Sequence, residues 1–489
     1  MKRSLQMLSL LLAATLLSAG FSSQDQPRKR STGAPADTDT VVTKMAVISG
    51  DSLSGFTEGG TPVQLFIGNV RGVQGSTKLS AGWARRSVEQ KRLVLVSGVV
   101  VTDGGDTLSA DTVHYNEQEK VGTAAGSVRL SDGDATVHAT AGVYFIDDKR
   151  TVFHQGLELT DSTAVVTGDR GEYWTGSKRL EIAGDVRFDG QDVAMRSDSM
   201  TYLRAEDVSL ARGSVAVDRV TGEEESRVRT LLFGSWARTD GQAGISDMRG
   251  RPLMAQLHRD SSGTDTLFML ADVLTTRDAD TLRSLAAMGD VRYWARDMAA
   301  TADSMYYEER PARGTADTMD RGMILLYGAP VLWTEGTEIT GDSMRVVLTG
   351  QEVDSLLVWG DAFVAHEDTV LGRINQMRGR MLVACFGADQ RRTFKLGPNA
   401  EVVYFQRDEG NAPDGAFRVS GDEAVLELAG DEPQQFSFGE SQGTYYPESV
   451  LEMPLELDGF RWNPGLMPAV TLFMFDKRFI AWMRQEAGS

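Results

Sequence analysis

The chain has little of the chemistry that most enzymes and metalloproteins use. Its 489 residues include one cysteine and five histidines. The single thiol, Cys385, excludes an intrachain disulfide, and we expect it to be a small core residue rather than a nucleophile. The histidines are not paired at ligand spacing, and no P-loop or dinucleotide fingerprint is present. The sequence therefore predicts neither a metal site nor a cofactor.

Positive charge and long apolar runs are also scarce. The chain has 69 acidic and 50 basic side chains and a formal net charge of −19. This excess argues against nucleic acid as a partner, because affinity for phosphates comes from Lys and Arg. The apolar run Leu8–Ala19 is shorter than the roughly 20 residues that cross a bilayer, and no spanning run follows it. With 41% hydrophobic residues, the composition still indicates a globular protein with a large core.

The N-terminus has the pattern of a secretory signal. Lys2 and Arg3 precede the apolar run, and Ser18-Ala19-Gly20 follows with small residues. We interpret residues 1–23 as a cleaved signal peptide, with a retained membrane anchor as the alternative. Cleavage would remove two cations and no anion, which changes the net charge from −19 to −21. Residues 24–44 are polar and predict a flexible linker.

Two short motifs alternate along the rest of the chain. The first is a small residue, an aspartate, Ser or Thr, and an apolar residue. The second is a glycine that begins a short alternating run, and between Gly68 and Gly213 these glycines step by 30, 28, 30, 28 and 29 residues. From Gly250 to Gly397 the steps lengthen to 39, 39, 32 and 37 residues. Clear copies of the first motif are Ala110-Asp111-Thr112-Val113, Ser197-Asp198-Ser199-Met200, Ala302-Asp303-Ser304-Met305 and Gly341-Asp342-Ser343-Met344.

The period within each repeat is two. Val186 and Phe188 would face one side of a strand and Arg187 the other. Each repeat therefore predicts about two β-strands, which cannot bury their apolar face alone. Stacked repeats give an all-β structure with an apolar interior and a polar outside.

One block resembles an esterase motif. Gly50-Asp51-Ser52-Leu53 matches the nucleophile block of GDSL-type esterases, whose base comes from a C-terminal Asp-x-x-His. Only Asp111-Thr112-Val113-His114 has that spacing, and it lies early in the chain inside a repeat. Gly341-Asp342-Ser343-Met344 repeats the block in the register of the other copies. We therefore predict that the protein is not an enzyme, and that the Asp-Ser/Thr pair forms a strand-edge turn by bonding backbone N–H groups.

The repeat resembles that of the OstA-like (organic solvent tolerance) family. The similarity lies in Leu108–Tyr115, a polar turn, and Ala124–Leu130. Asn375–Met381 and Gly397–Phe405 resemble the closing part of long OstA-like proteins of Bacteroidetes type. The family includes the periplasmic lipopolysaccharide-transport protein LptA and the N-terminal domain of LptD. The resemblance covers residues 45–405 and is clearest from Gly98 to Val217.

The resemblance implies a fold, a location and a function. The fold is an elongated antiparallel β-jellyroll of stacked two-strand repeats, open along one side, and the location is the periplasm, with an inner- or outer-membrane association left open. The function is that of a bridge which shields the acyl chains of lipid A. Other transport proteins of the two membranes would join by edge-to-edge strand addition. The alternative is a structural β-repeat envelope protein without a ligand.

The expected organisation has five parts: a signal (1–23), a linker (24–44), two repeat regions (45–218 and 219–407) and a terminal cap or docking extension (408–489). Apolar residues after the repeat glycines are the candidates for lining the groove. At −21, affinity for a phosphorylated glycolipid must come from this interior rather than from bulk charge. The candidates are Val128, Leu130, Val186, Phe188, Val215, Val217, Val291, Tyr293, Val331, Trp333 and Phe363.

Overall fold

A computed structural model describes most of the chain beyond the signal and linker. It describes residues 47–190, 193–221, 228–260, 263–279, 282–296, 298–310, 321–334, 336–349, 352–387, 391–408, 410–429, 432–451 and 454–488. The expected signal peptide and the expected linker lie outside these ranges. Within them, 32 strands belong to one antiparallel sheet, which confirms the predicted all-β fold class.

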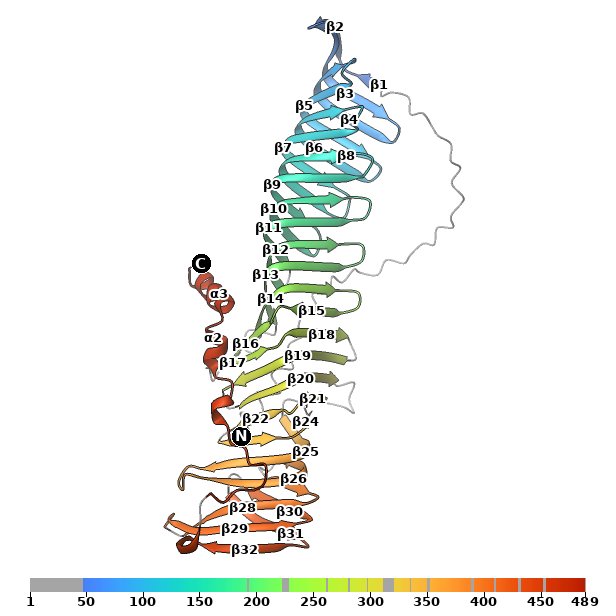
Figure 1. Cartoon of the computed structure of the whole chain (residues 1–489). Coiled ribbons are helices and arrows are strands. Elements are labelled where there is room, and N and C mark those ends of the chain that lie inside the picture. The colour runs from blue at the N-terminus through green and yellow to red at the C-terminus, as the bar shows by residue number, and fades with distance from the viewer. Residues whose placement is uncertain are drawn as a thin grey trace, which may run out of the picture. The chain divides into compact units, whose positions relative to one another are not determined.

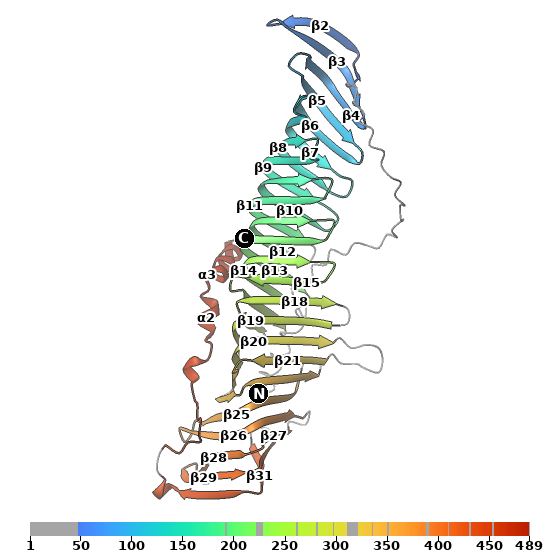
Figure 2. The same ribbon diagram turned by 45° about the vertical axis from the view of Figure 1, so that its right-hand side comes forward.

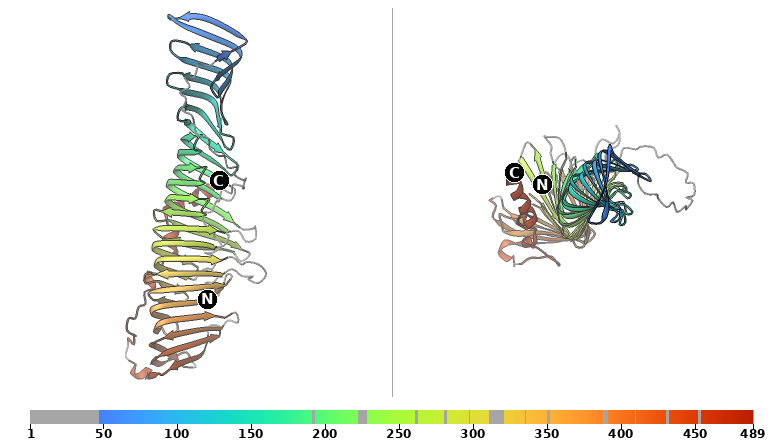
Figure 3. Two further views of the ribbon diagram at one scale, coloured as in Figure 1. Left: turned by 90° about the vertical axis from the view of Figure 1, so that its right-hand side faces the viewer. Right: turned by 90° about the horizontal axis from the view of Figure 1, so that it is seen from above.

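The chain divides into two compact units. The N-terminal unit comprises the described part of Ala19–Val217 together with Trp236–Gln242. The C-terminal unit comprises Asp218–Ser235 and Ala243–Ser489. In each unit successive hairpins stack on one another (Figures 1 and 3).

The first thirteen strands start in the N-terminal unit. They are β1 (Val47–Ser49), β2 (Ser52–Glu58), β3 (Thr61–Gln74), β4 (Thr77–Ser87), β5 (Arg92–Asp103), β6 (Asp106–Asn116), β7 (Val121–Ser131), β8 (Thr136–Phe145), β9 (Arg150–Thr160), β10 (Ala164–Trp174), β11 (Arg179–Gly190), β12 (Val193–Leu203) and β13 (Val208–Thr221). From β3 to β12 each strand pairs with the next along the chain.

The remaining strands start in the C-terminal unit. They are β14 (Val228–Asp240), β15 (Ile245–Arg249), β16 (Leu253–Asp260), β17 (Gly263–Leu270), β18 (Val273–Ala279), β19 (Leu282–Ala295), β20 (Met298–Arg310), β21 (Arg321–Tyr327), β22 (Val331–Thr334), β23 (Thr337–Thr340), β24 (Ser343–Thr349), β25 (Glu352–Asp368), β26 (Arg373–Phe386), β27 (Arg391–Gly397), β28 (Ala400–Arg407), β29 (Pro413–Gly421), β30 (Glu423–Ala429), β31 (Glu432–Gly439) and β32 (Gln442–Pro447).

Most of the repeat glycines lie within strands, where the strand bends, whereas Gly250 and Gly328 lie between strands and Gly397 ends β27. In β7 the pairing register with β8 shifts between Ala125 and Val128. Gly126 and Ser127 at this bulge both have positive φ, +74° and +46°. A bulge with positive φ bends a strand sharply, so one strand supplies two limbs. The glycine motif predicts the start of a short strand, but in β7 it is the corner of a longer one.

The aspartates of the first motif pack against these corners. A Cβ atom at Gly126 would collide with the carboxylate of Asp111, and Gly184 stands in the same relation to Asp169. Asp111 lies within β6 rather than at its end. For Asp111 the expected strand-edge turn is thus wrong, whereas Asp342 does lie at a strand edge, between β23 and β24. In both copies the aspartate occupies the space that the missing side chain of a partner glycine leaves, so the two motifs form one interlocked corner.

The strand ladder also continues past the expected boundary at residue 407. β28 pairs with β29 and β29 with β32. Pro447 is the last residue of β32, where a missing N–H costs nothing to the ladder. Beyond it lie the short 3-10 helices η2 (Glu448–Val450) and η3 (Pro464–Leu466), then the α-helices α2 (Val470–Met474) and α3 (Lys477–Gly488). We call residues 448–488 the strap.

Candidate functional site

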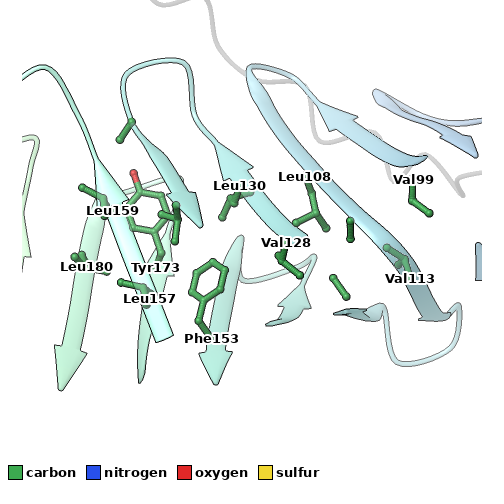
Figure 4. Packing of buried hydrophobic residues seen from close by; sticks show 14 of the residues in the cluster. Val99, Leu108, Val113, Val128, Leu130, Phe153, Leu157, Leu159, Tyr173 and Leu180 are labelled. Atoms are coloured by element: carbon green, nitrogen blue, oxygen red, sulfur yellow. The ribbon is translucent and has the colours of Figure 1, made fainter. Parts of the chain in front are cut away.

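The candidate site is the apolar interior between the two limbs of the bent strands. In β11 the buried side chains come from both limbs: Leu180 and Ile182 before the corner, Val186 and Phe188 after it. All four belong to one cluster that extends over successive strands of the N-terminal unit. Figure 4 shows Phe153 and Tyr173 lying among Val128, Leu130 and Leu157 in this interior.

The corner glycine sets which residues face the interior. In β7, β11, β13 and β19 the second and fourth residues after the glycine are buried. Arg187, between the two buried residues of β11, is exposed. Because strand side chains alternate between faces, this rule places eight of the eleven candidates inside: Val128, Leu130, Val186, Phe188, Val215, Val217, Val291 and Tyr293.

Val331, Trp333 and Phe363 lie on the opposite face. They are the third or fifth residues after Gly328 and Gly360, so the inward positions there belong to other residues. Directly paired residues share a face, and Tyr293 pairs with Ala300, which pairs with Leu332. The same row continues through Ile339 to Val364. Leu332 and Val364 therefore face the interior, while Trp333 and Phe363 face outward.

The strap explains why these outward residues are apolar. Phe363 and Phe405 form a buried cluster with Leu457 of the strap, and the ring centroids of Phe363 and Phe460 are 6.2 Å apart. Further along the strap, Phe473 stacks on Phe268 at 5.4 Å. Figure 1 shows α2 running beside β16 and β17, and Figure 2 shows α2 and α3 along one side of the stacked strands. The strap thus covers the outward face of this wall, and the tail that was expected as a cap or a docking segment packs on its own unit.

Two buried polar side chains hold the strap backbone. Gln376 accepts a hydrogen bond from the Leu457 N–H at 2.8 Å and donates one to the Leu455 carbonyl at 3.1 Å. Glu338 accepts one from the Asn463 N–H at 2.9 Å and one from Trp333 Nε1 at 3.0 Å. Both side chains belong to outward-facing rows. Sequence reasoning missed them because isolated polar residues in strands give no signal of a buried partner.

The N-terminal unit contains a buried polar group that the sequence did not indicate. Arg204 Nη1 lies 3.0 Å from Asp132 Oδ2 and 2.9 Å from the Tyr173 hydroxyl. Burial alone would raise the pKa of Asp132, but hydrogen bonds from Tyr173 and the Ala135 N–H, with the charge of Arg204, lower it below its usual value. The Asp132 carboxylate is therefore ionised at neutral pH.

The esterase-like block has a structural role at the first corner. Asp51 Oδ2 accepts a hydrogen bond from Asn69 Nδ2 at 2.8 Å and lies over Gly68. Asp51 thus repeats the interlock seen between Asp111 and Gly126. Cys385 is exposed rather than part of the core, because it lies on the outward face of β26. Among the described residues no group of three or more His, Cys, Asp or Glu could hold a metal ion.

Residues 84–208 match a family model described as the LptA/(LptD N-terminal domain) LPS transport protein. This segment is an OstA-like domain of the LptA/LptD N-terminal type. It contains β5 to β12 complete, and hence most of the interior cluster.

A structural comparison matched LptH from Pseudomonas aeruginosa, described as the LptA-homologous periplasmic component of its lipopolysaccharide transport device. The match has 14% identity and a TM-score of 0.17, and covers 30% of this chain and 95% of LptH. A search of curated proteins found no match. None of the helices in the described ranges is long and apolar enough to cross a membrane.

Proposed function

We propose that the protein transports lipopolysaccharide through the periplasm and shields lipid A acyl chains in the interior of its bent strands. The observation that carries the proposal is the run of buried apolar side chains that continues across strand after strand of the OstA-like domain. Each buried CH₂ group of an acyl chain contributes about 0.8 kcal/mol. An apolar channel can therefore supply the affinity that an acidic chain cannot obtain from bulk charge.

The terminal strands suit the expected partners. All seven residues of β2 are exposed, including Leu53 and Phe56, and among the described residues β2 pairs only with β3. A free edge with unpaired backbone groups can accept a strand from another protein. We propose that transport proteins of the two membranes add to such terminal edges, which would extend the interior across the junction.

A structural β-repeat protein without a ligand remains the second candidate. It is favoured by the packing of the interior itself, where Phe153, Leu159 and Tyr173 are almost completely buried by neighbouring side chains. The two candidates differ in whether the walls separate to admit a lipid.

Photo-crosslinking in cells tests the transport proposal. A photoreactive residue at Phe188 or Val217, both inside, should capture lipopolysaccharide, whereas one at the exposed Arg187 should not. Capture from Arg187 alone would contradict the proposal. A depletion strain with normal lipopolysaccharide in its outer membrane would favour the structural candidate.

A further inference from the structure

Two rims of hairpin turns border the interior of the N-terminal unit on the side away from the corners. The first rim includes the turns at 175–178, between β10 and β11, and 204–207, between β12 and β13. The second rim includes the turns at 132–135, between β7 and β8, and 161–163, between β9 and β10. The strands bend between the rims, so the rims are the two edges at which the interior meets water.

Side chains from the two rims bond directly to one another. Arg204 of the first rim reaches Asp132 Oδ2 at 3.0 Å and Asp161 Oδ2 at 3.4 Å, both on the second rim. The side chains of Arg204, Asp132 and Asp161 are only 8%, 2% and 7% exposed. A guanidinium buried against two carboxylates is therefore a built contact and not a chance meeting of surface charges.

Two more contacts widen the bridge. Tyr173, at the end of β10 beside the first rim, donates a hydrogen bond to Asp132 and meets Arg204 Nη1 at 2.9 Å. Lys178 of the first rim forms an ion pair with Asp134 of the second. We call Asp132, Asp134, Asp161, Tyr173, Lys178 and Arg204 the seam latch.

We infer that the seam latch is the gate through which acyl chains enter the interior, an inference that rests on the proposed function. Lipid A keeps its phosphorylated sugars in water while its acyl chains lie inside, so the link between them must pass between the rims. At the strands that the latch bridges, the closed latch and a loaded lipid occupy the same space. Loading there requires the latch to open.

The chemistry of the latch suits reversible opening. Its bonds are between charged or hydroxyl groups, and water solvates each of these groups once the rims separate. An apolar seal would instead expose hydrocarbon on opening. The phosphates of an arriving lipid also offer Arg204 and Lys178 acceptors that replace their carboxylate partners.

Crosslinking across the rims tests the gate. In a Cys385→Ser background, which removes the only native thiol, Asp134→Cys and Lys178→Cys would place one thiol on each rim. A cleavable bis-maleimide would then join the rims of the purified full-length protein, with the joined fraction measured by mass spectrometry. We expect the joined protein to lose binding of lipid A, titrated by native mass spectrometry, and to regain it when the crosslinker is cleaved.

The matched control joins two turns of the same rim. Lys120 and Asp147 form an exposed ion pair at 2.9 Å between the turns at 117–120 and 146–149. Crosslinking Lys120→Cys to Asp147→Cys leaves the rims free to separate, so lipid A binding should persist. Equal binding by both joined proteins would overturn the gate, and so would equal loss. If the protein binds no lipid A before crosslinking, the proposed function itself fails.

Discussion

In the N-terminal unit, the strand positions that face away from the interior include exposed polar residues, such as Arg187 in β11. In the C-terminal unit the corresponding positions carry Trp333 and Phe363, and both are buried. The first wall meets water on its outer face, and the second meets the strap. The same bent-strand repeat can therefore form a wall that is apolar only on its inner face or on both faces. The outer face is apolar where another segment of the chain covers it.

The units also close by different means. In the N-terminal unit, the seam latch joins the rims through ionic contacts. In the C-terminal unit, aromatic stacking and two buried polar side chains attach the strap to an outer face. Ionic contacts favour reversible opening, whereas buried aromatic packing favours permanence. The proposed gate therefore lies in the N-terminal unit, whereas the strap stabilises the C-terminal unit.

The largest expected effect comes from truncating the main aromatic anchor of the strap. Phe473→Ala should destabilise the attachment of the strap by about 3–5 kcal/mol, because a buried phenyl ring is lost and a cavity remains. Hydrogen exchange in β16 and β17 should accelerate, while exchange in β10 and β11 stays unchanged. Phe475→Ala is the control, since its ring is 71% exposed. Equal acceleration in both units would break the distinction between them.

A smaller effect is expected from Gln376→Ala. The change leaves the Leu457 N–H and the Leu455 carbonyl without their partner, which costs about 1–3 kcal/mol. The loss of stability is measured by chemical denaturation, with hydrogen exchange of the C-terminal unit as the signal. Gln435→Ala is the matched control, because Gln435 is exposed and bonds only Ser437 among the contacts described. Equal costs for the two substitutions would show that strap bonding adds no stability.

A pH dependence is expected in the N-terminal unit. Burial, with the charges of Asp240 and Asp161, raises the pKa of Asp207 to about 7. Since the folded state holds this proton up to about pH 7 and the unfolded state releases it near pH 4, stability falls as the pH rises between these values and then levels off. Asp207→Asn should flatten that slope in urea titrations at pH 5 and pH 8.

The control for Asp207→Asn is the same substitution at exposed Asp148, on the turn at 146–149. It should leave the slope of the wild-type protein in place. A slope that persists in Asp207→Asn would assign the pH dependence to other groups and remove this difference between the units.

The residues that face the interior can be predicted in part from the sequence. Counting two and four residues from each corner glycine identifies Val186 and Phe188 correctly. Choosing instead the most apolar residues after the glycine selected Trp333 and Phe363, which face the other way. Hydrophobicity alone cannot tell an inner face from an outer face that another segment covers, because both exclude water.

The sequence by itself determined the repeat, the strand period and the corner glycines. These features recur about every 30 residues and involve only strands that are adjacent in the chain, so they leave a local pattern in the sequence. It also indicated the OstA-like family through that spacing. Only the tertiary structure decided the seam latch and the strap. Arg204 meets Asp132 across 72 residues, and Asn463 meets Glu338 across 125. Such contacts depend on the accumulated bend and twist of many stacked strands, which no local pattern in the sequence records.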